Sequence, residues 1–167
     1  MKIIFIRGLP GTGKTTIAKQ LARKFNARYL NIDEFKIKAK TGDFKKDCLY
    51  AYKMTLDSLS LLRKDKNINY IIMEEIFYNK KFVNDLIKFT KDNHFLSYWF
   101  QVKRSLRDLL KVESLRKRKI KNIKNDFYYL QKGIDSIKIK DEKVIKNLVI
   151  SSTVKKIISF VNNFKLS

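Results

Sequence analysis

Short apolar runs alternate with amphipathic segments along most of the chain. Residues 3–7 form a short apolar run and residues 68–73 a β-branched run, and both have the length of a strand that is buried on both faces. Residues 15–25, 47–63 and 79–91 carry apolar side chains at spacings of three and four, which predicts helices with one buried face. The alternation predicts an α/β fold in a single domain over residues 1–167, a three-layer sandwich around a mostly parallel five-stranded sheet.

The remaining elements follow from weaker patterns. Residues 36–46 show little periodicity and predict a short helix or a loop, and a helix over residues 127–134 is expected to stop at Gly133. Further strands are expected at residues 27–32, 95–102 and 148–150. Hydroxyl side chains at residues 151–153 would cap a last helix.

The first strand is followed by the sequence Gly8-Leu9-Pro10-Gly11-Thr12-Gly13-Lys14-Thr15-Thr16. The spacing of glycine, four residues and then Gly-Lys-Thr is typical of a phosphate-binding loop, and its strand-to-helix context is present. Glycines let successive backbone N–H groups point at phosphate oxygens, and the following helix adds a partial positive charge. Lys14 is then predicted to reach the β- and γ-phosphates, and Thr15 to hold Mg²⁺. The predicted nucleotide-binding residues are Gly8, Pro10, Gly11, Thr12, Gly13, Lys14, Thr15 and Thr16.

Acidic residues follow the second and third predicted strands. Asp33 ends the strand at 27–32, and Glu74 and Glu75 follow the strand at 68–73. In an open parallel sheet, ligands gather beyond the carboxyl ends of the strands, so these acids are expected to face the phosphate loop. A carboxylate at this place typically holds Mg²⁺ directly or through water, and either Glu74 or Glu75 could serve.

Charge adds a second, less specific indication. The formal net charge is +22, with 38 basic and 16 acidic residues, which favours a polyanionic partner, although a lysine-rich composition alone would also raise it. No stretch approaches the ~20 apolar residues of a membrane span, so a cytoplasmic protein without a membrane partner is expected. Cys48 is the single cysteine, which excludes an intramolecular disulfide.

The most basic stretch lies between residues 103 and 124. Its leucines predict a helix that becomes almost wholly polar near Arg116. A solvated basic face would explain it, but its place after the fourth strand favours a lid over about residues 104–126 that closes on the phosphates.

Taken together, these motifs resemble small P-loop kinases related to polynucleotide 5′-hydroxyl kinases, seryl-tRNA kinases and zeta-toxin-type phosphotransferases. The resemblance implies a P-loop NTPase fold with strand order 2-3-1-4-5 and a helical lid. It implies ATP as donor, Mg²⁺ as cofactor and Asp33 as the base toward an acceptor hydroxyl. It also makes Arg116 the candidate lid arginine and Arg118 its substitute.

The sequence therefore predicts transfer of the γ-phosphoryl group of ATP to a hydroxyl. Candidate acceptors are a nucleic-acid 5′ end and a phosphorylated small molecule such as a nucleotide-containing metabolite, because positive charge favours phosphate-bearing partners. Two alternatives stay open: an NTP hydrolase without an acceptor, and a nucleic-acid-binding protein in which the nucleotide only stabilises the fold.

Overall fold

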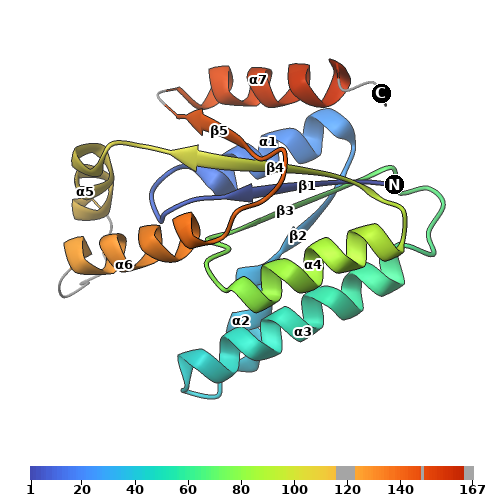
Figure 1. Ribbon diagram of the computed structural model, residues 1–167, viewed down its shortest axis with the longest axis horizontal. Coiled ribbons are helices and arrows are strands. Elements are labelled where there is room, and N and C mark those ends of the chain that lie inside the picture. The colour runs from blue at the N-terminus through green and yellow to red at the C-terminus, as the bar shows by residue number, and fades with distance from the viewer. Residues whose placement is uncertain (116–122, 148, 164–167) are drawn as a thin grey trace.

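The computed structural model describes residues 1–115, 123–147 and 149–163. Five strands form one sheet in the order β2-β3-β1-β4-β5, and every neighbouring pair is parallel. The strands are β1 (Lys2–Arg7), β2 (Arg28–Asn31), β3 (Tyr70–Glu75), β4 (Leu96–Lys103) and β5 (Lys143–Lys146). The predicted α/β class and strand order are confirmed (Figure 1).

Helices cover both faces of the sheet and the edge where the strands end (Figure 1). One face carries α1 (Lys14–Phe25) and α7 (Ile150–Asn163), which pack against each other. The other face carries α2 (Ile32–Ala39), α3 (Phe44–Leu62) and α4 (Lys80–Asp92). Beyond the carboxyl ends of β1 and β4 lie α5 (Leu106–Ser114) and α6 (Ile123–Ser136).

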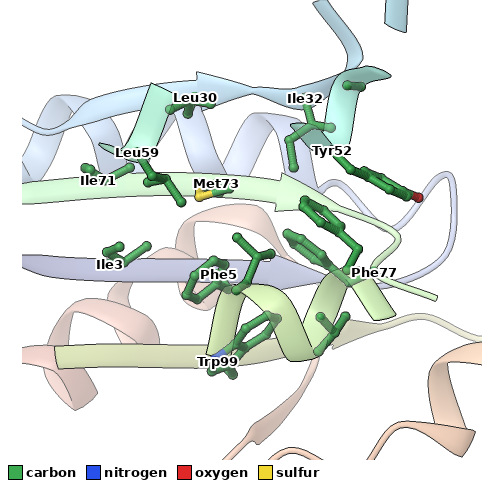
Figure 2. Close-up of a cluster of buried hydrophobic side chains, with 14 of the residues drawn as sticks. Ile3, Phe5, Leu30, Ile32, Tyr52, Leu59, Ile71, Met73, Phe77 and Trp99 are labelled. Carbon is green, nitrogen blue, oxygen red and sulfur yellow. The ribbon is translucent and has the colours of Figure 1, made fainter. Parts of the chain in front are cut away.

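Successive side chains of the central strand β1 pack alternately into two separate hydrophobic cores, one on each face of the sheet. Ile3 and Phe5 pack on the α3–α4 side, whereas Ile4 and Ile6 pack on the α1–α7 side, as the two-residue period of a strand requires. On the α3–α4 side, the Phe5 ring stacks on Trp99 of β4 with centroids 4.0 Å apart (Figure 2). The aromatic residues Tyr98, Trp99 and Phe100 of β4 are all buried and belong to the core.

The fifth strand lies earlier in the chain than predicted. β5 is Lys143–Lys146, while residues 149–150 lead into α7 instead of forming a strand. β5 is an edge strand that pairs only with β4, and three of its four residues are exposed, so no buried apolar run marks it. Because α7 already begins at Ile150, the hydroxyls of residues 151–153 lie inside its first turn and do not precede it.

Gly133 does not stop a helix either. It lies inside α6, which continues to Ser136, and a Cβ on Gly133 would come within 3.2 Å of the Tyr78 Cβ. The glycine thus serves close packing of α6 on the segment that follows β3. Over the described parts of the chain, no helix has the length and apolar character needed to cross a bilayer.

Candidate active site

The loop between β1 and α1 contains glycines with positive φ, a backbone conformation that other residues rarely adopt. Gly13 has a φ of 90°, and a Cβ there would lie 2.7 Å from the Ile150 Cδ1. A Cβ on Gly8 would lie 2.3 Å from the carbonyl oxygen of Val102 in β4. Both positions therefore favour glycine: a side chain at Gly8 would collide with the β4 backbone, and at Gly13 it would have to adopt a positive φ that other residues rarely take.

One carbonyl group closes the loop from inside. The Leu9 oxygen accepts hydrogen bonds from the Thr12 backbone N–H at 3.3 Å, the Thr12 hydroxyl at 2.8 Å and the Lys14 ammonium at 3.1 Å. The Lys14 side chain is buried and folds back along the loop. The loop and its lysine are thus held in a fixed conformation by the chain itself.

A buried asparagine holds the loop from outside. The Asn147 side chain is 1% exposed, and its Nδ2 donates to the Thr12 carbonyl at 2.6 Å. The Thr153 hydroxyl of α7 donates to the Asn147 Oδ1 at 2.9 Å, which fixes the orientation of the amide. Because C=O and N–H point opposite ways in a trans peptide, the Asn147 bond directs the N–H of Gly13 away from Asn147.

The residue before the loop is anchored to α6 and the segment after it. Arg7, at the end of β1, is 2% exposed and forms an ion pair with Glu142. Its guanidinium also donates to the carbonyls of Ile134 and Ile137 at 3.1 Å. These partners compensate for the loss of water around the buried guanidinium, because a charged group in the interior is stable only when it is paired and hydrogen-bonded.

The two glutamates at the end of β3 have different partners. Glu74 Oε1 accepts from the Thr15 hydroxyl at 2.9 Å and from the Tyr29 hydroxyl at 3.1 Å. Burial and then the Glu74 carboxylate raise the pKa of Tyr29 well above its usual value, so Tyr29 stays a protonated donor. Glu74, and not Glu75, therefore lies beside the threonine that the loop motif assigns to Mg²⁺.

Glu75 belongs to a second cluster on the α2 side. The Lys36 ammonium donates to Glu75 Oε2 at 2.7 Å and to Asp33 Oδ1 at 2.9 Å. Burial disfavours the charged form of Lys36, but the pull of Glu75 and then Asp33 outweighs it and raises its pKa above the usual value. Asp33 lies in the first turn of α2, just past the end of β2, and its side chain is 64% exposed.

A single pocket of about 430 Å³ joins both clusters to the loop. It is lined by Pro10, Gly11, Gly13, Lys14, Thr15, Thr16, Asp33, Lys36, Phe44, Glu74, Glu75 and Ile76. The structure thus brings together most of the residues that the sequence predicted. Gly8 and Thr12 belong to the loop but are buried and do not line the pocket, and Arg116 and Arg118 lie outside the described residues.

Three residues that contact the site were not predicted from the sequence: Tyr29, Lys36 and Asn147. Lys36 lies three residues after Asp33 on a helix, a spacing that would have paired them had α2 been recognised. Tyr29 and Asn147 act across the fold, on β3 and on the loop, and no local pattern marks them.

The residues present fit a hydrated Mg²⁺. Within the described residues, no group of three or more His, Cys, Asp or Glu side chains could form a closed metal site. Mg²⁺ does not need one, because it is usually bound by one or two protein oxygens together with phosphates and waters. Thr15 and Glu74, adjacent at the mouth of the loop, supply that kind of oxygen.

Solved structures with this fold share nearly the whole chain. A tunicamycin resistance protein from Deinococcus radiodurans has a TM-score of 0.71 and 17% identity, over 96% of this chain and 95% of that one. The APS kinase of Mycobacterium tuberculosis, solved with AMPPNP and APS, has a TM-score of 0.66 and 17% identity, over 97% and 98%. At such identities the likeness shows the fold, that of kinase-like P-loop proteins.

Residues 1–130 match the model of a family described as "AAA domain", and the chain belongs to this family. Two archaeal proteins, both named "Putative adenylate kinase", match parts of it. The protein of Pyrococcus furiosus is 44% identical over 45 residues, 27% of this chain and 25% of that protein. The protein of Saccharolobus islandicus is 28% identical over 97 residues, 58% of this chain and 52% of that protein. The chain therefore spans about half or less of the length of these relatives.

Proposed function

We propose that this protein is an ATP- and Mg²⁺-dependent phosphotransferase that moves the γ-phosphoryl group of ATP to an acceptor hydroxyl. The observation that carries the proposal is the shared pocket, which joins the phosphate loop to the exposed carboxylate of Asp33. Because Asp33 and the phosphate loop line the same pocket of about 430 Å³, a hydroxyl bound at Asp33 would share the pocket with the donor phosphates, as phosphoryl transfer requires.

The donor half of the site is the loop and the start of α1. Backbone N–H groups of the loop and the Lys14 ammonium bind the phosphates of ATP, because fixed donors stabilise negative charge without reorganising. Thr15 and Glu74 would hold Mg²⁺, which when bound would neutralise charge that develops on the phosphate oxygens. Tyr29 keeps Glu74 in place through its hydroxyl.

The acceptor half is the Asp33, Lys36 and Glu75 cluster. Asp33 accepts the proton of the acceptor hydroxyl while the hydroxyl oxygen forms a bond to the γ-phosphorus. The bond between the γ-phosphorus and the β–γ bridging oxygen breaks, and ADP leaves. Lys36 orients Asp33 through the 2.9 Å bond and is itself anchored on Glu75. Glu75 thus serves the acceptor side and not the metal.

The direct test is transfer of label from γ-³²P-ATP to a panel of acceptors. The panel contains 5′-hydroxyl RNA and DNA, nucleosides, nucleotide sugars, small alcohols and AMP. Label on any hydroxyl supports the proposal. Label on AMP supports the second candidate, adenylate kinase activity, which the names of the archaeal relatives favour. Label released only as inorganic phosphate shows a hydrolase and contradicts both.

Asp33→Asn tests the assigned base. We expect the turnover of the active acceptor to fall about 10²–10⁴-fold, the usual contribution of a positioned general base, while ATP affinity is unchanged. Asp57→Asn, at an exposed position of α3 outside the pocket, is the matched control. Transfer by Asp33→Asn at the wild-type rate would remove Asp33 from the mechanism.

A further inference from the structure

Acidic residues are absent from two stretches of the sequence that meet in the fold. None of the 16 aspartates and glutamates lies in residues 1–32 or 143–167, although these stretches are about a third of the chain. The first stretch contains α1 and the second contains α7. Because these two helices pack side by side on one face of the sheet, the fold gathers both stretches into one layer (Figure 1).

The outer side of this layer is cationic. The apolar residues of both helices are buried in the core beneath, for example Ile17 and Leu21 of α1 and Ile157 of α7. Exposed basic residues occupy the opposite side of each helix and the adjoining β5, where the Lys143 ammonium lies 5.1 Å from the Phe160 ring centroid. The α1–α7 face is defined here by the exposed residues Lys19, Arg23, Lys24, Lys143, Lys155 and Lys156.

The two layers treat their lysines differently. In the α2–α4 layer, three lysines form ion pairs, Lys36 with Glu75, Lys81 with Asp85 and Lys88 with Asp92. The exposed Lys46 and Lys53 form none with the described residues, but they share α3 with the acidic residues Asp47 and Asp57. Within the part of the chain that the structure describes, none of the six residues of the α1–α7 face forms an ion pair. A composition rich in lysine would load both layers alike, so the separation of charge is a property of this face.

We infer that the α1–α7 face binds the phosphodiester backbone of nucleic acid. Five of the six cations lie on two adjacent helices and the sixth, Lys143, lies on β5 beside α7. Together they can replace counterions along a row of phosphates, which is the main source of sequence-independent affinity. The large exposed apolar residues of the described chain, such as Phe44 and Tyr128, lie outside α1 and α7. The exposed apolar residues nearest the face are Val144 of β5 and Val149 before α7, which are aliphatic and do not stack on bases, so the cations are the main binding groups of the face.

This surface is separate from the acceptor half of the pocket. Asp33, Lys36 and Glu75 lie at the α2 side of the sheet edge, whereas the six cations lie on the opposite layer. The inference thus goes beyond the proposed phosphotransfer and does not depend on it. Asp141, which lines a small pocket beside Phe160, marks the rim of the face.

The test measures anisotropy of a fluorescein-labelled 20-base-pair DNA duplex titrated with full-length protein at several salt concentrations from 50 to 200 mM. One variant replaces Lys19, Arg23, Lys155 and Lys156 by Gln. The control variant makes the same charge change on the other layer, at the exposed residues Lys45, Lys46, Lys53 and Lys64. Circular dichroism melting checks the fold of each, and Arg23→Gln with Lys156→Gln is the milder replacement if the first variant melts early.

We expect the α1–α7 variant to bind the duplex at least tenfold more weakly at 50 mM salt. The slope of log affinity against log salt should fall by about 3 to 4, close to one per lost phosphate contact, with the control variant near wild type. Equal weakening of both variants, or of neither, would overturn the inference. So would a wild-type protein that sediments with vesicles of 30% phosphatidylserine but leaves the duplex unbound, because the partner would then be a membrane.

Discussion

Neighbouring residues at the end of β3 have different tasks because side chains alternate across a strand. Glu74 points to the α1 side, where Thr15 and Tyr29 donate to it, and Glu75 points to Lys36 on the α2 side. The sequence shows two equivalent carboxylates here. Their distinction arises only when β3 takes its register between β1 and β2, with Glu74 opposite Ile6 and Asn31.

Glu74→Gln and Glu75→Gln should therefore differ in their response to metal. We expect Glu74→Gln to raise the Mg²⁺ concentration needed for half-maximal binding of a fluorescent ATP analogue by about 10–100-fold, the usual cost of losing a group in or beside the coordination shell. Glu75→Gln should leave that concentration unchanged, because its partner is Lys36. A larger Mg²⁺ effect in Glu75→Gln would reverse the assignment.

At the scale of elements, α2 shows why the role of Lys36 could not be predicted from the sequence. This helix has eight residues, of which only Ile32 is buried, so it carries no apolar period to recognise. It forms because the Asn31 side chain accepts from the Asp33 N–H and because Asp33 and Glu34 complement its N-terminal partial charge. The sequence motif predicted the phosphate loop, but the side chains that contact the loop from other elements are determined by tertiary packing.

The link between α7 and the phosphate loop gives a prediction at this scale. Asn147→Ala removes the donor that holds the Thr12 carbonyl, which should free the Gly13 N–H and weaken ATP binding about tenfold. The buried Thr12 oxygen is also left without this partner, at a cost of about 1–3 kcal/mol in the free energy of unfolding.

Isothermal calorimetry and thermal melting separate the two effects. Thr55→Val is the control, because it removes a buried hydroxyl that bonds only within α3, to the Ala51 carbonyl. It should lower the melting temperature and leave ATP affinity intact. If Asn147→Ala loses stability in the same way but binds ATP like the wild type, Asn147 does not position the loop.

At the scale of the whole molecule, the sheet was predictable where strands are buried on both faces. β1, β3 and β4 have near-continuous apolar runs and were found, whereas the exposed edge strand β5 was misplaced by a few residues. The strand order comes from the resemblance to P-loop kinases, since the local pattern does not specify it. The separation of charge between the two helical layers became visible only once α1 and α7 were placed together.

Nucleotide binding should stabilise the whole fold, because the pocket takes residues from the loop after β1 and from α1, α2, α3 and β3. At a nucleotide concentration of 100 times Kd, linkage adds about 2.7 kcal/mol to the free energy of unfolding. For a chain of this size we expect the melting temperature to rise by about 5–10 °C with Mg²⁺ and a non-hydrolysable ATP analogue. The rise should shrink with EDTA, and Lys14→Ala should abolish it; an equal rise in that variant would place the nucleotide elsewhere.

The central place of β1 also has a consequence for biosynthesis. β1 precedes both of its neighbours in the chain, since Lys2 pairs with Tyr70 of β3 and with Leu96 of β4. At about 5–20 residues per second, the ribosome needs roughly 5–20 s to synthesise the chain from β1 to the end of β4. During that time the apolar run of β1 lacks its neighbouring strand β4. Lys2 and Arg7 flank this run, and charged residues at such positions oppose aggregation. We therefore expect Arg7 to protect the nascent chain before it anchors the folded one.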